Sequence, residues 1–448
     1  MKTWITGGTI VNQGRKYGGT IVIDGETIAD ILPATAATCL PETATTRVVD
    51  VSGCFVLPGM IDSHVHFREP GMTHKATIAT ESEAAAAGGV TTFFDMPNTI
   101  PQTTTLKALN EKLQTAARDS RVNYAFFIGA TRDNAEELSR VSPQLVPGIK
   151  VFMGSSTGGM LVDGDDALER LFSIDTVLPF MAHCEDTSII EANMERHQQR
   201  HGDDPDVAFH PEIRSREACI ASARKAVALA LKHHKRLHIA HLSTAEELSM
   251  MAADTGVCRS VTAEATVGHL WFSDADYARL GTRIKVNPSI KTASDRAALR
   301  QGIADGRITT VGTDHAPHLL TEKAGGCRRA SSGMPMVQYA LVAMLELVSQ
   351  GVISIERLAE LTAHNPARLF SVQQRGFVAP GMQADLAVVR PCTPWSPDGA
   401  DIRSKCGWSP MEDAVFHWRV AQTWCNGHEV FDGTHVDSNY RGQQVRFR

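Results

Sequence analysis

Short apolar runs alternate with segments of helical spacing through the middle of the chain. Each run leads into a polar or glycine-marked loop, and the following segment repeats apolar residues three and four apart, as Leu106, Leu109 and Leu113 do. Eight strand and helix units predict an α/β fold, a TIM-like (β/α)8 barrel with its chemistry at the carboxyl ends of the strands. The eight runs are Val56–Ile61, Thr91–Met96, Tyr124–Gly129, Ile149–Met153, Leu178–Ala182, Leu237–Ala240, Arg259–Ala263 and Ile308–Gly312.

Both ends of the chain have a different pattern, with short segments typical of β-strands. Thr9–Val11, Thr20–Ile23 and Thr46–Val49 lie between glycine-containing turns, and Ala384–Val389 and Arg419–Trp424 repeat this pattern near the carboxyl terminus. Two strand-rich ends around a different middle predict a small β-sandwich domain built from both termini. The predicted boundaries are 1–52 and 378–448 for the two parts of this domain and 53–377 for the barrel.

Composition and charge exclude several classes of function. The 448 residues are 43% hydrophobic and carry a formal net charge of -6, so the chain folds and lacks the basic excess that nucleic-acid binding needs. The nine cysteines are odd in number and form no CxxC pair, which is typical of reduced thiols. Since no window approaches the roughly 20 apolar residues of a membrane span and no signal peptide begins the chain, we expect a cytoplasmic protein.

Four histidines follow predicted barrel strands. His64 and His66 are two residues apart, so on an extended backbone both imidazoles point to one face and can bind one cation. Alone, this pair is equally typical of two polar residues at a strand end. His183 and His241 each end an apolar run, where a buried core histidine is the alternative for either one taken alone.

Lys150 and Asp314 add an amine and a carboxylate to the same predicted strand ends. Burial within the run disfavours the ammonium form of Lys150, and the neutral amine can react with carbon dioxide to give an anionic carbamate that bridges two metals. The alternative is a lysine that reaches solvent or pairs with an acid. Asp314 can move a proton between water and a leaving nitrogen, and its alternative is a helix N-cap.

These residues together resemble the binuclear amidohydrolase superfamily. Within it, the strings His64–Gly71, Asp95–Thr99 and Thr313–His318 resemble those of the longer, bacterial class I dihydroorotases. The resemblance covers essentially the whole chain, including the β domain.

The resemblance implies two zinc ions. His64, His66 and Asp314 would bind one zinc, His183 and His241 the second, and N6-carboxylated Lys150 would bridge them. Some class I relatives have an aspartate at the position of Lys150, so the carbamate bridge occurs in only part of the family.

The resemblance also implies substrate contacts. Arg68 and Asn98 would hold a substrate carboxylate, and Asn287 and His318 would contact the ring and that carboxylate. The backbone of Ser332 and Gly333 would also contact the substrate. Lys291 stands where several relatives have arginine, and its role stays open. The loop 319–333 is either a lid or an ordinary disordered surface loop.

The implied reaction is the reversible cyclisation of N-carbamoyl-L-aspartate to L-dihydroorotate and water, the third step of de novo pyrimidine (UMP) biosynthesis. It uses a binuclear zinc hydroxide mechanism in which Asp314 carries the proton. Hydantoinase or dihydropyrimidinase and allantoinase share the metal ligands, and Arg68 and Asn98 argue against their uncharged rings. A non-catalytic partner of aspartate transcarbamoylase would lose metal ligands, whereas this chain keeps all six. We expect a small-molecule substrate, no nucleic-acid or membrane partner, and a homodimer, as is common in the family.

Overall fold

The computed structural model describes residues 2–34, 46–154, 160–251 and 260–448. Arg259, which begins the seventh predicted run, lies outside these residues. None of the helices in the described ranges combines the length and the apolar character needed to cross a membrane.

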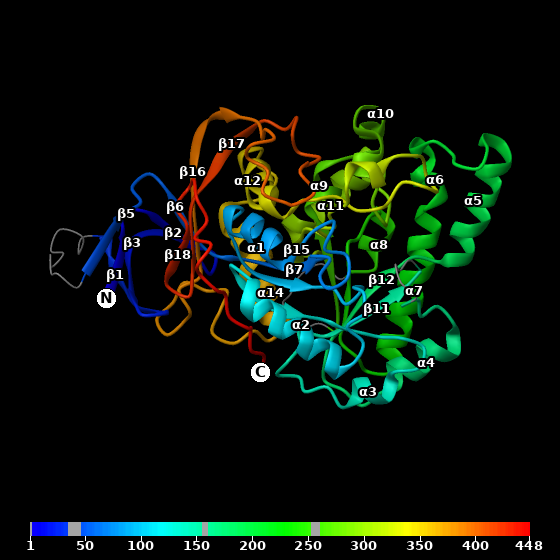
Figure 1. Ribbon diagram of the computed structural model, residues 1–448, viewed down its shortest axis with the longest axis horizontal. Helices are drawn as coiled ribbons and strands as arrows, with labels where there is room; N and C mark the ends of the chain where they lie inside the picture. Colours follow the sequence, from blue (N-terminus) through cyan, green and yellow to red (C-terminus); the bar gives the residue numbers. More distant parts are fainter. Residues whose placement is uncertain (1, 35–45, 155–159, 252–259) are drawn as a thin grey trace.

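A ring of parallel strands forms the barrel, as predicted (Figure 1). Backbone hydrogen bonds join each strand to the next, and a parallel bridge between Val65 and His315 joins the last strand to the first. The strands are almost wholly buried because helices cover the outside and side chains fill the inside. Their bounds are β7 (Met60–Val65), β8 (Val90–Asp95), β9 (Asn123–Phe126) continued by β10 (Ile128–Gly129), β11 (Ile149–Met153), β12 (Phe180–Cys184), β13 (Leu237–Ile239), β14 (Val261–Thr266) and β15 (Thr310–Gly312).

Helices follow the strands and pack around them. The Ala-rich helix α1 (Ile78–Ala87) begins at its N-cap Thr77, whose hydroxyl accepts a hydrogen bond from the backbone of Thr80, and ends at its C-cap Gly88. The α-helices of the described residues are α1 (Ile78–Ala87), α2 (Leu106–Asp119), α3 (Ala135–Ser139), α4 (Asp165–Ser173), α5 (Thr187–His201), α6 (His210–Ile213), α7 (Arg216–Lys232), α8 (Ala245–Ser249), α9 (Val267–Trp271), α10 (Tyr277–Leu280), α11 (Ala293–Asp305), α12 (Ala340–Ser349), α13 (Ile355–Ala359) and α14 (Asn365–Leu369).

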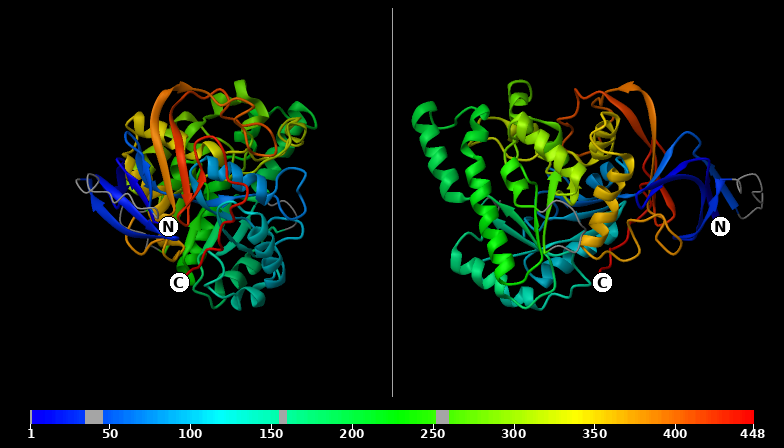
Figure 2. Two further views of the ribbon diagram at one scale, coloured as in Figure 1. Left: turned by 60° about the vertical axis from the view of Figure 1, so that its left-hand side comes forward. Right: turned by 180° about the vertical axis from the view of Figure 1, so that it is seen from behind.

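Both termini contribute strands to one sheet beside the barrel, as predicted (Figure 2). Its order is β18-β17-β16-β6-β2-β3-β1-β5, with β4 paired to β3, so strands from the two ends of the chain meet at β6. The bounds are β1 (Lys2–Thr6), β2 (Thr9–Asn12), β3 (Arg15–Asp24), β4 (Thr27–Pro33), β5 (Thr46–Asp50), β6 (Phe55–Pro58), β16 (Leu386–Trp395), β17 (Phe416–Cys425) and β18 (His428–Phe431).

The first predicted barrel strand, Val56–Ile61, divides between the two parts of the molecule. Its first half belongs to β6, which pairs with β2 and β16, and the barrel strand begins at Met60. Gly59 lies at the division, where an added Cβ would be 2.2 Å from the side chain of Thr91. One apolar run therefore serves two sheets, and only glycine allows the close approach at the crossing.

Candidate active site

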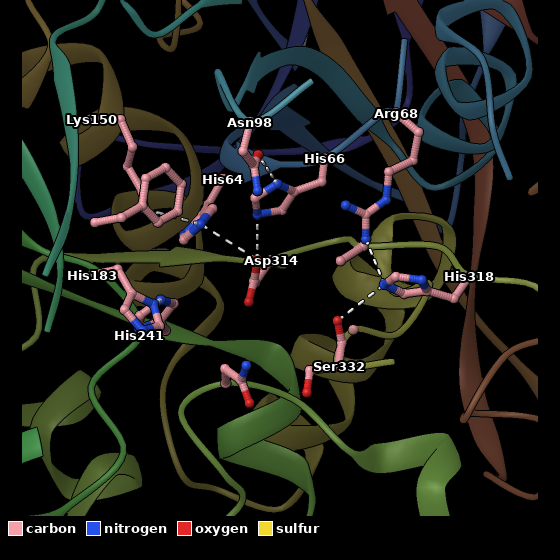
Figure 3. Close-up of a pocket in the computed structure, with 14 residues that line it drawn as sticks. His64, His66, Arg68, Asn98, Lys150, His183, His241, Asp314, His318 and Ser332 are labelled. Atoms are coloured by element: carbon pink, nitrogen blue, oxygen red, sulfur yellow. Dashed lines mark hydrogen bonds and ion pairs between the residues drawn. The ribbon is translucent and has the colours of Figure 1, made fainter. Parts of the chain in front are cut away.

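All twelve residues singled out from the sequence line one pocket at the carboxyl end of the barrel (Figure 3). Asp314 lies near its centre, with His183 and His241 on one side and Arg68 and His318 on the other. The barrel topology brings them together because parallel strands end at the same rim. The twelve are His64, His66, Arg68, Asn98, Lys150, His183, His241, Asn287, Asp314, His318, Ser332 and Gly333.

His64, His66 and Asp314 form a compact group of candidate metal ligands. One potential ligand atom from each lies within 4.8 Å of the other two. Oδ1 of Asp314 is 3.0 Å from Nε2 of His66 and 3.4 Å from Nε2 of His64. Two imidazole nitrogens and a carboxylate oxygen around one point are a donor set that zinc accepts.

His183 and His241 form a second candidate group. Nδ1 of His183 lies 2.9 Å from Nε2 of His241. Burial, followed by the charge of His183, holds the pKa of His241 well below its usual value, so its ring is neutral. Nδ1 of His241 is buried without a hydrogen-bond partner in the described part of the chain. A cation between the two rings fits this arrangement of nitrogens.

Lys150 lies between the two groups. Its side chain is fully buried, and Nζ is 3.4 Å from Nε2 of His64. Within the described residues no carboxylate lies within 4.0 Å of this nitrogen, and burial lowers the pKa of the amine. An amine with a lowered pKa is suited to carboxylation, and the resulting anion would supply the negative charge that this position lacks.

Three further side chains orient the histidines. The outer ring nitrogens of three of the four histidines lie within hydrogen-bond distance of an oxygen: His64 contacts Glu264 at 2.7 Å, His66 contacts Asn98 at 2.7 Å and His183 contacts Glu185 at 2.8 Å. If each outer nitrogen carries the proton, the inner nitrogen keeps its lone pair for a metal.

Sequence reasoning missed Glu264 and Glu185. A glutamate inside an apolar run, as in Thr262-Ala263-Glu264-Ala265, was the signal that could have identified the first. Glu185 follows His183 by two residues and is held by Arg214, whose Nη1 lies 2.5 Å from the same carboxylate. Both glutamates are fully buried.

The backbone is strained where three of the predicted residues stand. Arg68, His241 and Asp314 have φ values of 66°, 37° and 48°, in the left-handed region that favours glycine. Each such residue costs roughly 1–3 kcal/mol, and this cost is typical of functional sites. The surrounding hydrogen bonds hold the chain in this form; the backbone N–H of Thr313, for example, donates to Asp62 at 3.1 Å.

Arg68 is a buried cation that faces the pocket. Its guanidinium donates from Nε to the carbonyl of Pro317 at 3.1 Å, and Nη2 lies 2.9 Å from Nε2 of His318. Among the described residues no carboxylate lies within 4.0 Å of it. Burial lowers the pKa of Arg68 to about 10, so the group stays charged at neutral pH. The pocket therefore offers a positive charge to an anionic ligand group.

His318 has cationic neighbours at both ring nitrogens. Nζ of Lys75 lies 3.1 Å from Nδ1. Nη2 of Arg68 lies 2.9 Å from Nε2, and the carbonyl oxygen of Ser332 lies 3.1 Å from the same nitrogen. Burial, with the charges of Arg68 and Lys75, holds the pKa of His318 far below its usual value. Lys75 and Arg68 can only donate, so a neutral ring accepts from one of them: with its proton on Nε2 it accepts from Lys75 at Nδ1 and can donate to Ser332 or to a ligand, and with its proton on Nδ1 it accepts from Arg68 at Nε2.

Internal contacts hold the loop that carries Ser332 and Gly333. Nζ of Lys323 donates to the carbonyls of Lys285, Ser331 and Gly333 at 3.0, 2.7 and 2.7 Å. The backbone N–H of Gly326 donates to Asp204 at 2.8 Å. The alternative of a disordered surface loop is therefore wrong, whereas its function as a lid stays a prediction.

Lys291 does not line this pocket. Its Nζ donates to the hydroxyl of Ser289 at 2.7 Å and to the carbonyl of the same residue at 3.2 Å. The side chain is buried and lines a different pocket together with Arg216 and Thr292, so the role of Lys291 stays open.

Known proteins resemble this chain over nearly its full length. The sequence model of the amidohydrolase family matches residues 55–430. A dihydroorotase of Halobacterium salinarum is 39% identical over 394 residues, which cover 87% of this chain and 89% of that protein. A dihydroorotase of Syntrophus aciditrophicus is 30% identical over 447 residues, which cover 96% of this chain and 99% of that protein.

Solved structures of related enzymes share the fold. L-hydantoinase (dihydropyrimidinase) from Arthrobacter aurescens has a TM-score of 0.91 at 26% identity and covers 99% of both chains. Dihydropyrimidinase from Brevibacillus agri has a TM-score of 0.85 at 21% identity and covers 97% of this chain and 96% of that one. The second likeness concerns the fold alone.

Proposed function

The chain belongs to the amidohydrolase family, and we propose that it is a dihydroorotase. It interconverts N-carbamoyl-L-aspartate and L-dihydroorotate plus water, the third step of de novo pyrimidine biosynthesis. The observation that carries this proposal is the buried guanidinium of Arg68, which faces the pocket and has no carboxylate within 4.0 Å in the described residues. Dihydroorotate bears a ring carboxylate that supplies this missing charge.

Two divalent ions, which we take to be zinc, complete the proposed site. His64, His66 and Asp314 hold one ion and His183 and His241 the other, with N6-carboxylated Lys150 between them. The ions supply a water of lowered pKa and polarise the amide carbonyl. The clustered donor atoms and the solitary buried amine support this assignment.

The substrate is held by groups on the side of the pocket opposite His183 and His241. Arg68 pairs with the carboxylate of dihydroorotate, and the Nε2 proton of His318 donates to the same group. Asn98 adds its amide to the carboxylate while its Oδ1 orients His66. Asn287 and the backbone of Ser332 and Gly333 contact the ring from the other wall.

Asp314 moves the proton. Its carboxylate lies among His64, His66 and His241, whose proximity holds its pKa well below the usual range despite burial, so it is ionised at neutral pH. In hydrolysis, water adds to the ring amide carbonyl carbon and gives its proton to Asp314. Asp314 then delivers this proton to the amide nitrogen as the carbon–nitrogen bond breaks. Cyclisation reverses these steps.

A cyclic amidase for uncharged rings is the second candidate, because the likeness to L-hydantoinase covers 99% of both chains. Hydantoin and dihydrouracil have no carboxylate, so their binding would leave Arg68 without an anion. Allantoin also has no carboxylate, so it too would leave Arg68 without an anion. A non-catalytic role is disfavoured by the retention of all six candidate metal ligands at one mouth. A homodimer stays a prediction.

The test is the steady-state hydrolysis of L-dihydroorotate beside dihydrouracil, hydantoin and allantoin, with purified zinc-loaded protein. We expect a preference for dihydroorotate of at least about 100-fold in kcat/KM, the upper range for a charge-assisted contact. Preference for an uncharged ring would overturn the substrate assignment. Inactivity on all four compounds would overturn the proposal as a whole.

A further inference from the structure

A second cavity lies where the barrel meets the terminal sheet. It opens between α12 and β17, which lie side by side in Figure 1, and the last residue of α1 closes one wall. Its volume is about 310 Å³. This volume is within the range of small-molecule pockets, roughly 300–1,000 Å³. None of its lining residues belongs to the barrel mouth.

Aromatic side chains form much of the wall. The ring centroids of Tyr339 and Trp395 are 6.4 Å apart, and Phe431 lines the same space. The indole nitrogen of Trp395 donates to the carbonyl of Trp418 at 3.0 Å, so this side chain offers the cavity only its apolar surface. Such walls favour a flat, apolar ring.

Two guanidinium groups lie at the same cavity. Cζ of Arg419 is 3.9 Å from the centroid of the Trp395 ring, and Cζ of Arg403 is 5.7 Å from that of Phe431. Arg403 also donates to the carbonyl of Thr434. Within the described ranges neither guanidinium has a carboxylate within 4.0 Å. Asp401 is the one acid of the lining, so the two arginines outnumber it there, and Asp398 and Glu412 lie outside the lining but near enough to act on Tyr339.

A buried hydroxyl completes the polar lining. The side chain of Tyr339 is 4% exposed, and its hydroxyl oxygen has no hydrogen-bond partner among the described residues. Buried hydroxyls nearly always have a partner, because an unpaired one loses its hydration without compensation. A ligand with a polar edge would provide the missing partner.

We propose that this cavity binds a small planar anion, an aromatic or heteroaromatic ring that carries a carboxylate or a phosphate. Arg403 and Arg419 pair with the anionic group, the ring packs against Trp395 and Phe431, and the hydroxyl of Tyr339 bonds to a polar atom of the ligand. The site is independent of the chemistry proposed at the barrel mouth.

The chain segment that holds Arg403 also reaches the barrel mouth. The hydroxyl of Ser404 donates to Glu81 at 2.6 Å, and the backbone N–H of Lys405 donates to the same carboxylate at 3.0 Å. Glu81 lies 2.8 Å from Nε2 of His315, the neighbour of Asp314. A ligand that contacts Arg403 would therefore touch a chain segment whose next two residues are hydrogen-bonded to Glu81.

Four small probes test the proposed chemistry by isothermal titration calorimetry. Benzoate and benzamide have nearly the same shape and differ in charge, whereas phenyl phosphate and inorganic phosphate differ by the ring. We expect benzoate to bind at least about ten-fold more tightly than benzamide, and phenyl phosphate at least about ten-fold more tightly than inorganic phosphate. The stronger of benzoate and phenyl phosphate identifies the preferred anion. Equal binding of benzoate and benzamide, or no binding of any probe, would overturn the proposal.

Variants locate the binding. Arg419→Gln is expected to weaken the stronger probe about ten-fold, and Tyr339→Phe, which removes only the hydroxyl, about three-fold. Arg118→Gln is the matched control, because Arg118 is an exposed arginine of α2 and does not line the cavity. Arg68→Met should also leave binding unchanged. Loss of binding in Arg68→Met would place the probe at the barrel mouth. Full binding in Arg419→Gln would place the probe outside the cavity. Either outcome would contradict the proposal.

Discussion

At the scale of single residues, Arg68 provides a buried positive charge at the barrel mouth. Arg68 is a cation that is 4% exposed, and its polar contacts within the described chain are a carbonyl and a neutral imidazole. A buried charge without an ionic partner costs folding free energy. The presence of Arg68 at this position therefore indicates that an anionic group of the ligand is its ionic partner.

Arg68→Met tests this reasoning. Loss of the charge-assisted contact should lower kcat/KM for L-dihydroorotate by roughly 10- to 100-fold. Zinc content should stay at the wild-type level, because Arg68 contacts no candidate metal ligand through its guanidinium. Steady-state kinetics and metal analysis measure both quantities.

The control for this variant is Arg132→Met. Arg132 does not line the pocket, and its side chain is 59% exposed and paired with Asp163, so its loss should change neither quantity. Loss of zinc from Arg68→Met would show that Arg68 supports the metal site instead of the substrate.

Lys75 positions His318. Its ammonium lies 3.1 Å from Nδ1 of His318 and 2.9 Å from Glu322, and a hydrogen bond donated to Nδ1 favours the tautomer with its proton on Nε2. Lys75→Met should raise KM for dihydroorotate about three- to ten-fold with a smaller change in kcat, whereas Lys75→Arg should preserve most of the affinity. The ¹⁵N chemical shifts of His318 report the tautomer directly. An unchanged tautomer in Lys75→Met would remove this role.

Lys150→Ala removes the amine that we propose to carry the bridging carbamate. We expect loss of most activity and most bound zinc, with partial rescue by short-chain carboxylic acids that replace the carbamate. Metal analysis with and without added acetate or propionate measures this effect. Lys150→Ala with full zinc and full activity would contradict the bridge.

At the scale of elements, a buried ion pair connects α2 to the end of β8. Nζ of Lys112 lies 2.5 Å from Asp95, and both side chains are fully buried. The other oxygen of Asp95 accepts a hydrogen bond from the backbone N–H of Phe67 at 2.7 Å. The helix thereby supports the turn between His66 and Arg68, so a residue outside the pocket determines the shape of the site.

Lys112→Met leaves Asp95 buried without its partner. The free energy of unfolding should fall by about 3–5 kcal/mol, the cost of breaking a buried pair on one side. Lys107→Met on the same helix is the matched control, since the side chain of Lys107 is 87% exposed and its ion pair with Glu111 is worth at most about 1 kcal/mol. Urea unfolding followed by circular dichroism compares the two variants. If both variants lose the same small amount of unfolding free energy, the ion pair between Lys112 and Asp95 does not stabilise this part of the protein.

At the scale of the whole molecule, Glu81 joins the barrel to the carboxyl-terminal region. It contacts His315 of the mouth together with Ser404 and Lys405 of the segment that leads to β17. Burial alone would raise the pKa of Glu81, but the contacts with His315, Ser404 and Lys405 hold it below its usual value.

The lowered pKa of Glu81 predicts a dependence on pH. A carboxylate whose pKa is lower in the folded state contributes stability above its unfolded pKa, and this contribution is lost as the pH falls through the folded pKa. Glu81→Gln should therefore be less stable than the wild type at neutral pH, and the difference should shrink under acid conditions. Thermal unfolding at several pH values measures this difference. A difference that stays constant with pH would show that the charge of Glu81 is not the cause.

Much of this protein was predictable from local sequence. The alternation of apolar runs with helical segments predicts the barrel, because periods of 2 and 3.6 residues are local properties of the backbone. The candidate ligands were recognisable because His183 and His241 follow such runs directly and His64 comes three residues after the end of another. The terminal sheet was recognisable from the strand-like texture at both ends.

Tertiary structure decided which distant residues share an environment. Glu264 orients His64 from 200 positions away, and Arg419 and Tyr339 meet at one cavity although they lie on different elements. The division of Val56–Ile61 between two sheets likewise depends on the strands that pair with each half. Sequence by itself determined the alternation of apolar runs with helical segments and which reactive groups stand near the ends of those runs, because these features depend on neighbouring residues. The partners of those groups follow from the closure of the barrel, because contacts between distant segments exist only once the chain has folded.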